Sequence, residues 1–302
     1  MSAQANSLKS IFYALGANLA VAVAKLLAAI TTGSSSMLAE AIHSCADCGN
    51  QGLLILGLKQ ADRPATDEHP LGYGKAIYFW SFIVALMLFS MGGLFSIYEG
   101  LHKLHEPQAI SKPWLAIGII VFSMIAESVS LRSCLREINK VRHGRSLWHW
   151  FRETRQSELI VVLGEDTAAL IGLSLALIAI LATIISGNPV YDAWGSIAIG
   201  ALLVLVAIGI GIEVHGLLIG QSVEENVRRE ILASLEQRGE IDTVLNLITL
   251  QLGKDVMVAV KARMSSYQRP DEMIAAINRC EVALKDAVPQ VRWVFFEPDN
   301  RL

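Results

Sequence analysis

The pattern of apolar and polar positions divides the chain into two parts. Before Gly220, apolar residues form six runs that are long enough for membrane-spanning helices, which need about 20 mostly apolar residues. These runs cover residues 8–31, 36–58, 77–99, 114–134, 158–186 and 190–219. After Gly220, charged residues are frequent and no long apolar run occurs. We therefore predict an all-α bundle of six transmembrane helices over residues 1–220 and a separate domain over residues 221–302.

The pattern after Gly220 predicts a small α+β domain. Helical periodicity covers residues 224–237 and 270–288, and the second of these helices begins at a proline. Alternating apolar positions predict three strands, at residues 244–252, 256–264 and 291–297. The resulting order, αββαβ, is typical of a small α+β sandwich.

The charges in the loops predict the orientation of the spans. Residues 132–155 carry seven Lys and Arg residues, whereas residues 31–36 and 187–190 carry none. The positive-inside rule places residues 132–155 in the cytoplasm, and an even number of spans then places both termini and the C-terminal domain there as well. Because no Arg-rich transit segment precedes the first run, we expect a multi-pass protein of the cell inner (plasma) membrane.

Composition agrees with a membrane protein and excludes several classes of function. Hydrophobic residues make up 53% of the sequence, charged residues make up 18%, and the mean hydropathy is +0.46. The formal net charge of −3 excludes an overall basic nucleic-acid-binding surface. The sequence has no phosphate-binding glycine loop and no Gly-x-Ser-x-Gly motif, which argues against an ATP-driven pump and a serine hydrolase.

A ridge of polar residues crosses the second apolar run. His43 and Asp47 are four residues apart, so they share one face of the helix. An imidazole and a carboxylate at this spacing can converge on one divalent metal ion. Glu40 and Asn50 extend the ridge, but for them we favour a structural role, such as the pairing of Glu40 with Lys25 in the first run.

The fifth apolar run supplies the other candidate ligands. Glu165 and Asp166 lie near its start, and a carboxylate costs about 2.5–3.5 kcal/mol at the centre of a membrane helix. Adjacent side chains point about 100° apart, so the two cannot face one ion equally well. We expect Asp166 to be a metal ligand and Glu165 to be a fourth ligand, a proton acceptor or an interfacial group. For Glu127, in the fourth run, a structural role is favoured.

Two stretches of sequence carry a family resemblance. One leads from Thr32-Gly33-Ser34 through Met37-Leu38-Ala39-Glu40-Ala41 to His43-Ser44-x-x-Asp47, and the other is His69-Pro70-x-Gly72-Tyr73-Gly74-Lys75. With the six runs and the αββαβ pattern, they resemble the cation diffusion facilitator family of metal/proton antiporters. The resemblance covers nearly the whole chain and implies a homodimer formed through the C-terminal domain.

The resemblance also implies which residues bind the transported metal. In that family, two residues four apart in the second span and two residues four apart in the fifth span form the site. His43, Asp47 and Asp166 match three of these positions, and the fourth falls on Val162, which cannot bind a metal. This departure, with the run over residues 161–170, is similar to the branch that contains the mitochondrial zinc-transporter-like members.

Two accessory metal sites of the family look degraded in this chain. In the loop after the second run, His69 matches a ligand position, but Thr66 and Tyr73 occupy the positions of its partners. The sequence contains no histidine after His215, so we expect no histidine-rich regulatory site in the C-terminal domain.

These features predict secondary transport of a divalent metal cation out of the cytoplasm in exchange for protons. The cation would bind His43, Asp47 and Asp166, with Glu165 nearby; such ligands lose protons when they bind metal and regain them on release. Zinc is the favoured cation, and Fe²⁺, Mn²⁺ and Co²⁺ are compatible with a donor set rich in oxygen. The expected partners are the cation, protons, the lipid bilayer and a second copy of the chain, with no resident cofactor and no nucleic acid.

Two other classes of function stay open at this stage. An intramembrane metal-dependent hydrolase could use the same residues with Glu165 as a general base, although the sequence has no H-E-x-x-H motif. A membrane scaffold or sensor without transport activity would use the αββαβ domain as its working part. Metal-dependent proton movement would distinguish transport from both.

Overall fold

The computed structural model describes residues 18–107, 109–142 and 144–301, which form two compact units. The first unit contains the described chain up to Gly57, together with Trp80–Leu147 and Glu158–Val214. The second unit contains Leu58–Phe79, Trp148–Ser157 and the chain from His215 onwards. Each unit therefore draws on three separate stretches of sequence.

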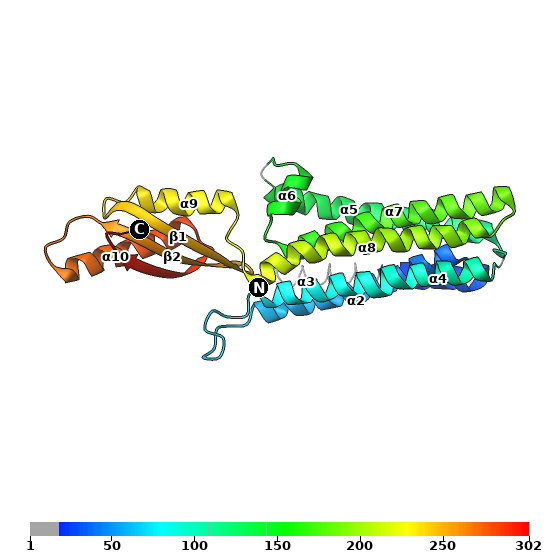
Figure 1. Ribbon diagram of the computed structural model, residues 1–302, viewed down its shortest axis with the longest axis horizontal. Helices are drawn as coiled ribbons and strands as arrows, with labels where there is room; N and C mark the ends of the chain where they lie inside the picture. Colours follow the sequence, from blue (N-terminus) through cyan, green and yellow to red (C-terminus); the bar gives the residue numbers. More distant parts are fainter. Residues whose placement is uncertain (1–17, 108, 143, 302) are drawn as a thin grey trace. The chain divides into compact units, whose positions relative to one another are not determined.

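The first unit is built from long helices that run alongside one another (Figure 1). A helix over Asn18–Thr32 comes first. It is followed in chain order by α2 (Ser35–Ala61), α3 (Ala76–Met87), the π-helix η1 (Leu88–Leu94), α4 (Phe95–His105), α5 (Pro113–Val141), α7 (Ser157–Ser186) and α8 (Val190–Ile219). The segments α3, η1 and α4 join into a single helix, Ala76–His105.

Four of the predicted spans are confirmed by length and composition. Among the described residues, the helices long and apolar enough to cross a membrane are Ala76–His105, α5, α7 and α8. The helix Asn18–Thr32 is shorter, since the first predicted run lies partly outside the described residues. Helix α2 has 27 residues, but the polar ridge from Glu40 to Asn50 lowers its hydropathy. The six-span count therefore stays a prediction.

Glycines allow the long helices to approach closely. A Cβ added at Gly93 in η1 would lie 2.6 Å from Cγ2 of Val204 in α8, and one added at Gly164 in α7 would lie 2.6 Å from Cδ1 of Ile210. A Cβ added at Gly200 would lie 2.6 Å from the backbone oxygen of Gly93. Small residues at such crossings are typical of helices that pack within a bilayer.

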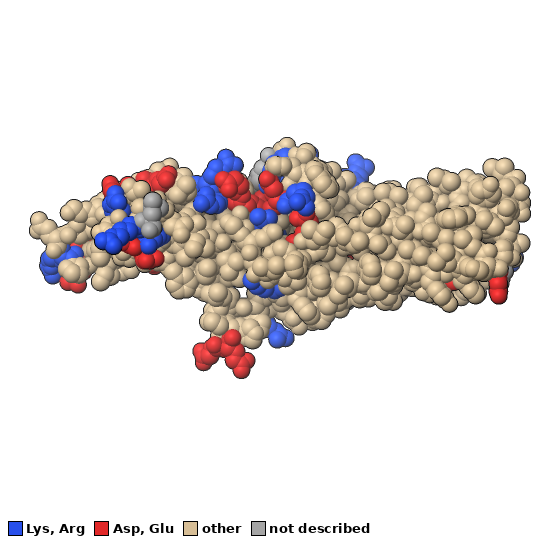
Figure 2. All heavy atoms as spheres, viewed as in Figure 1, with Lys and Arg blue, Asp and Glu red and all other residues tan. Residues whose placement is uncertain are grey.

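The outer surface of the long helices is apolar. Ile178, Ile185 and Leu205 are 63%, 85% and 68% exposed, and Figure 2 shows that the visible face of these helices is almost free of charged side chains over most of its length. A continuous exposed apolar surface of this kind fits contact with lipid rather than with water.

The order αββαβ is confirmed in the second unit. Its elements are α9 (Glu225–Glu236), β1 (Ile241–Leu252), β2 (Asp255–Met264), α10 (Pro270–Ala287) and β3 (Val291–Pro298). The strands form one sheet in the order β1-β2-β3, with β1 and β2 antiparallel and β2 and β3 parallel. Strand β1 begins at Ile241, three residues before the predicted start.

Helices α9 and α10 pack against each other and against the sheet. The core between them holds Val256, Val258 and Val260, alternate residues of β2, with Ile231 of α9 and Leu284 of α10. Alternation along β2 therefore places one face of the strand in the core, as the sequence pattern predicts.

Segments that precede the C-terminal domain in sequence also belong to the second unit. The backbone N–H of Gly253, in the turn between β1 and β2, donates to the Tyr78 hydroxyl over 3.0 Å, and Lys254 forms an ion pair with Asp62. A Cβ at Gly74 would collide with the backbone oxygen of Leu252. A short helix that the sequence pattern did not predict, α6 (Leu147–Glu153), lies in the basic loop, and its Trp150 is fully buried.

Candidate metal-binding site

His43 and Asp47 lie together on one face of α2, as their spacing predicts. Nδ1 of His43 is 3.4 Å from Oδ1 of Asp47, and His43 is completely buried. Within the described part of the chain, neither ring nitrogen of His43 nor Oδ1 of Asp47 has a hydrogen-bond partner. Buried polar atoms without partners are costly. An imidazole and a carboxylate that lack other partners are therefore available to a cation.

Glu40 and Lys25 form a buried ion pair beside these residues. Nζ of Lys25 donates to Oε2 of Glu40 over 3.2 Å and to Oγ of Ser44 over 2.7 Å, and all three residues are buried. Oε1 of Glu40 faces Gly172 of α7, where an added Cβ would collide with it. This geometry agrees with the structural role favoured for Glu40, because the ammonium group of Lys25 lies next to the Glu40 carboxylate and compensates its charge.

The two adjacent acids of α7 face different helices. Oε1 of Glu165 accepts a hydrogen bond from Nδ2 of Asn50 in α2 over 2.6 Å, whereas Oδ2 of Asp166 accepts one from Oγ of Ser130 in α5 over 3.1 Å. Both acids are buried within the helical unit, and the role of Glu165 stays a prediction. Asn50 and Ser130 were not expected as their partners, because the contacts depend on how separate helices are rotated.

A cavity of about 40 Å³ lies where the first helix, α2, α5 and α7 meet. Its lining includes four carboxylates, namely those of Asp47, Glu127, Glu165 and Asp166, and also Val162. His43 is not part of this lining, but its Nδ1 lies 3.4 Å from Oδ1 of Asp47, which is. Ionised carboxylates in one buried space repel each other unless cations or protons neutralise them.

The described residues include no group of three His, Cys, Asp or Glu side chains close enough to hold a metal ion as they stand. The predicted ligands thus surround a common cavity without forming a closed coordination shell. Side-chain rotation or helix movement is needed to close a shell around an ion.

Another buried acid, Asp192 of α8, was not singled out by the sequence pattern. It is completely buried and accepts hydrogen bonds from Oγ of Ser34 and the backbone N–H of Ser35, each over 2.7 Å, and from the Ser36 hydroxyl. The carboxylate therefore caps the N-terminus of α2, the helix that carries His43 and Asp47. The available signal was the serine run, which is a typical helix start.

The loop after α2 shows how the accessory position His69 is used. The His69 ring stacks on the Tyr73 ring with centroids 4.3 Å apart, and Oγ1 of Thr66 lies 3.4 Å from the Tyr73 hydroxyl. The three residues at the accessory ligand positions therefore contact one another, with a ring and a hydroxyl where two metal ligands were expected.

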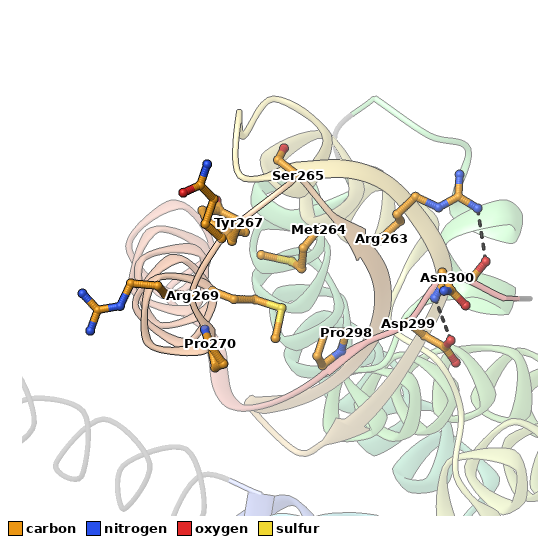
Figure 3. Close-up of a pocket in the computed structure, with 11 residues that line it drawn as sticks. Arg263, Met264, Ser265, Tyr267, Arg269, Pro270, Pro298, Asp299 and Asn300 are labelled. Carbon is orange, nitrogen blue, oxygen red and sulfur yellow. Dashed lines mark hydrogen bonds between the residues drawn. The ribbon is translucent and has the colours of Figure 1, made fainter.

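The C-terminal domain contains a separate open cavity of about 530 Å³ near the start of α10 (Figure 3). The one carboxylate in its lining, Asp299, forms an ion pair with Lys261 over 2.7 Å. Arg263 donates to the backbone oxygen of Asn300, and Arg269 points away from the cavity. This donor set does not suit a divalent cation.

Comparison with known proteins agrees with the helical unit and its acidic cavity. Residues 11–219 match the family described as the cation efflux transmembrane domain. The chain belongs to the cation efflux family. This confirms the resemblance to the cation diffusion facilitator family, and it favours a transporter over an enzyme, which removes the basis for the hydrolase alternative.

Relatives of this cation efflux protein place it near a mitochondrial branch. It is 34% identical to "Proton-coupled zinc antiporter SLC30A9, mitochondrial" from Homo sapiens over 231 residues, which are 76% of this chain and 41% of that protein. It is 31% identical to "Metal tolerance protein C4" from Arabidopsis thaliana over 216 residues, 71% of this chain and 47% of the relative. The chain thus spans less than half the length of these two relatives.

A third relative extends over both parts of the cation efflux protein. "Magnetosome protein MamB" from Magnetospirillum gryphiswaldense is 24% identical over 287 residues, which are 93% of this chain and 90% of that protein. This match therefore includes the C-terminal domain as well as the long helices.

The expected location in the cell inner (plasma) membrane is wrong. The SLC30A9 proteins of Homo sapiens, Pongo abelii, Xenopus laevis and Mus musculus, which are 32–34% identical to this cation efflux protein, are all named mitochondrial. The expectation relied on the residues that precede the first apolar run. Since the chain spans only 41% of these relatives, its start says nothing about location.

Proposed function

We propose that this cation efflux protein carries a divalent metal cation, zinc in the first instance, across a membrane in exchange for protons. The observation that carries the proposal is the shared cavity, into which α2 brings Asp47 and α7 brings Glu165 and Asp166. His43, whose ring nitrogens have no hydrogen-bond partner among the described residues, lies 3.4 Å from Asp47. The name of the human relative, a proton-coupled zinc antiporter, supports both the cation and its exchange partner.

The cation is bound by His43, Asp47 and Asp166, with Glu165 beside them. One imidazole and several carboxylates form a donor set that suits Zn²⁺ and is compatible with Fe²⁺, Mn²⁺ and Co²⁺. When the cation leaves, protons take its place on these groups, because several ionised carboxylates cannot share a small buried cavity unneutralised. Metal release and proton uptake are then coupled, because both occur at the same side chains.

The remaining parts of the chain have supporting roles in this proposal. The helix Asn18–Thr32 and α2 span the membrane with the four longer apolar helices, which gives six spans within residues 1–220. Residues 221–302 form a domain through which two copies of the chain associate. The cation moves away from the side of the membrane on which this domain lies.

Transport in proteoliposomes tests the proposal. The purified protein is reconstituted with a metal-sensitive dye and a pH-sensitive dye inside the vesicles, and Zn²⁺ is added outside. We expect Zn²⁺ uptake coupled to opposite proton movement in the wild type, and loss of both in Asp47→Ala and Asp166→Ala. Asp271→Ala, at a position 81% exposed on α10, is the matched control and keeps both signals.

Two outcomes contradict the proposal. If Asp47→Ala and Asp166→Ala transport Zn²⁺ like the wild type, the cation does not pass through this cavity. If the wild type moves neither metal nor protons with any of the four cations, the scaffold or sensor alternative is favoured instead.

A further inference from the structure

Val162 and Glu127 face the same cavity from different helices. Val162 of α7 occupies the position at which the family resemblance places a fourth metal ligand, and a valine side chain offers no donor atom. Glu127 comes from α5, and its carboxylate lines the same cavity of about 40 Å³ together with Asp47 and Asp166. A donor from α5 thus adjoins the space that a ligand at position 162 would fill.

The orientation of α5 brings Glu127 toward the proposed ligands. Ser130 lies three residues after Glu127, so the two side chains share one face of the helix. Oγ of Ser130 donates a hydrogen bond to Oδ2 of Asp166 over 3.1 Å. This contact turns the face of α5 that carries Glu127 toward α7 and toward Asp166.

Among the residues that the structure describes, Glu127 has no hydrogen-bond or ion-pair partner, and Lys25 acts on its charge only at longer range. Its neighbour Glu40, in contrast, is paired with Lys25. The neighbouring His43 is completely buried with both ring nitrogens unpartnered. An acid in a membrane helix needs a compensating charge. The cavity is lined by four carboxylates, and the His43 imidazole lies 3.4 Å from one of them, Asp47, so a cation is the compensating charge that this arrangement suits.

We propose that Glu127 is a ligand of the transported cation and supplies the donor that Val162 lacks. This inference rests on the proposed function, since it adds a residue to the same site. The resulting donor set, one imidazole nitrogen and carboxylate oxygens from three helices, is rich in oxygen. It therefore binds Mn²⁺ better, relative to Zn²⁺, than a site with a second nitrogen or sulfur donor would.

The first test measures Zn²⁺ binding to the purified full-length protein in detergent by isothermal titration calorimetry at fixed pH. We expect Glu127→Gln to lower the affinity by at least about tenfold. Changing a residue that only contacts a metal ligand already lowers metal affinity by about 10- to 100-fold, so losing a ligand should cost no less. Glu137→Gln, the same substitution on an exposed part of α5, leaves it unchanged. Adding Val162→Asp to Glu127→Gln restores most of the lost affinity, since residue 162 lines the same cavity.

The second test does not depend on loss of binding. In Glu127→Cys loaded with Co²⁺, a thiolate at position 127 that binds the ion gives a thiolate-to-cobalt charge-transfer band in the near ultraviolet. The wild type and Glu137→Cys retain the four native cysteines and show no such band. If Glu127→Cys binds Co²⁺ without this band, residue 127 is not a ligand.

The outcomes separate this inference from the proposed function. If Asp47→Ala and Asp166→Ala lose Zn²⁺ binding while Glu127→Gln binds like the wild type, the site stands and Glu127 is not part of it. If Asp47→Ala and Asp166→Ala also bind and transport normally, the proposed function itself fails.

Discussion

The buried pair of Lys25 and Glu40 provides a sharp test of how the first helix is attached to α2. Nζ of Lys25 is 3.2 Å from Oε2 of Glu40 and 2.7 Å from Oγ of Ser44, and both charged side chains are 0% exposed. We predict that Lys25→Met or Glu40→Gln alone destabilises the helical unit strongly, while the double substitution does so far less. The reason is that each single change leaves one charge buried without its partner.

The size of the effect follows from the geometry. At 3.2 Å and an effective dielectric constant of about 20, two unit charges attract each other by about 5 kcal/mol. Removing one partner of a buried pair costs about 3–5 kcal/mol, whereas replacing both partners by neutral groups of similar size is often close to neutral. We therefore expect about 3–5 kcal/mol for each single variant and about 1 kcal/mol for the double variant, which implies a strongly non-additive cycle.

Equilibrium unfolding in mixed micelles, followed by the helical circular dichroism signal, measures the cycle. The matched control is the exposed pair of Lys140 and Glu137 on α5, where Lys140→Met and Glu137→Gln should each change the free energy of unfolding by less than about 1 kcal/mol. The reasoning is refuted if the single variants at Lys25 and Glu40 are as mild as these controls. It is also refuted if the effects of the two changes add.

Two further predictions concern other charged groups. Asp192→Ala removes the acceptor of the Ser35 backbone N–H and the carboxylate partner of the Ser34 and Ser36 hydroxyls, which lie 3.1 Å from each other. A buried donor left unsatisfied costs about 1–3 kcal/mol, so hydrogen exchange at the start of α2 should accelerate. Asp192→Asn keeps one acceptor oxygen and should have a smaller effect; equal exchange in both variants and the wild type would contradict the cap. In the second unit, a backbone N–H and the Arg279 guanidinium hold the pKa of Glu240 below its ordinary value of 4.5. Its contribution to stability is therefore complete above about pH 4.5 and is lost as the pH falls through the folded-state pKa; hydrogen exchange of β1 and α10 should respond to acid less steeply in Glu240→Gln, and identical profiles would contradict the assignment.

Apolar periodicity predicted most of the fold because each element depends mainly on its own residues. The run at 114–134 identified α5, yet the helix continues to Val141, since helical hydrogen bonds need no apolar side chains beyond the lipid. The π-helix η1 was not predictable in the same way. It lies where Gly92 and Gly93 face α8 closely, and that contact joins residues about a hundred positions apart in the sequence.

In the candidate site too, contacts within one helix were predictable from the sequence and contacts between helices were not. The pairing of His43 with Asp47 follows from helical spacing alone, and the structure places them 3.4 Å apart. The hydrogen bonds of Glu165 to Asn50 and of Asp166 to Ser130 join different helices. They depend on the rotation of each helix about its axis, which is set by close contacts such as that of Gly164 with Ile210. A single sequence offers no measure of that rotation.

Glu40 and Glu127 illustrate why residue type in an apolar span does not settle function. From the sequence, both are acids in membrane helices for which the structural role was favoured. In the structure, Lys25 lies 3.2 Å from Glu40 and compensates its charge, while Glu127 lines the cavity with Asp47 and Asp166 and has no such partner among the described residues. The hydrogen-bonded ion pair with Lys25 therefore distinguishes the two acids: Glu40 joins α2 to the first helix, and Glu127 is the acid that we propose as a ligand of the transported cation.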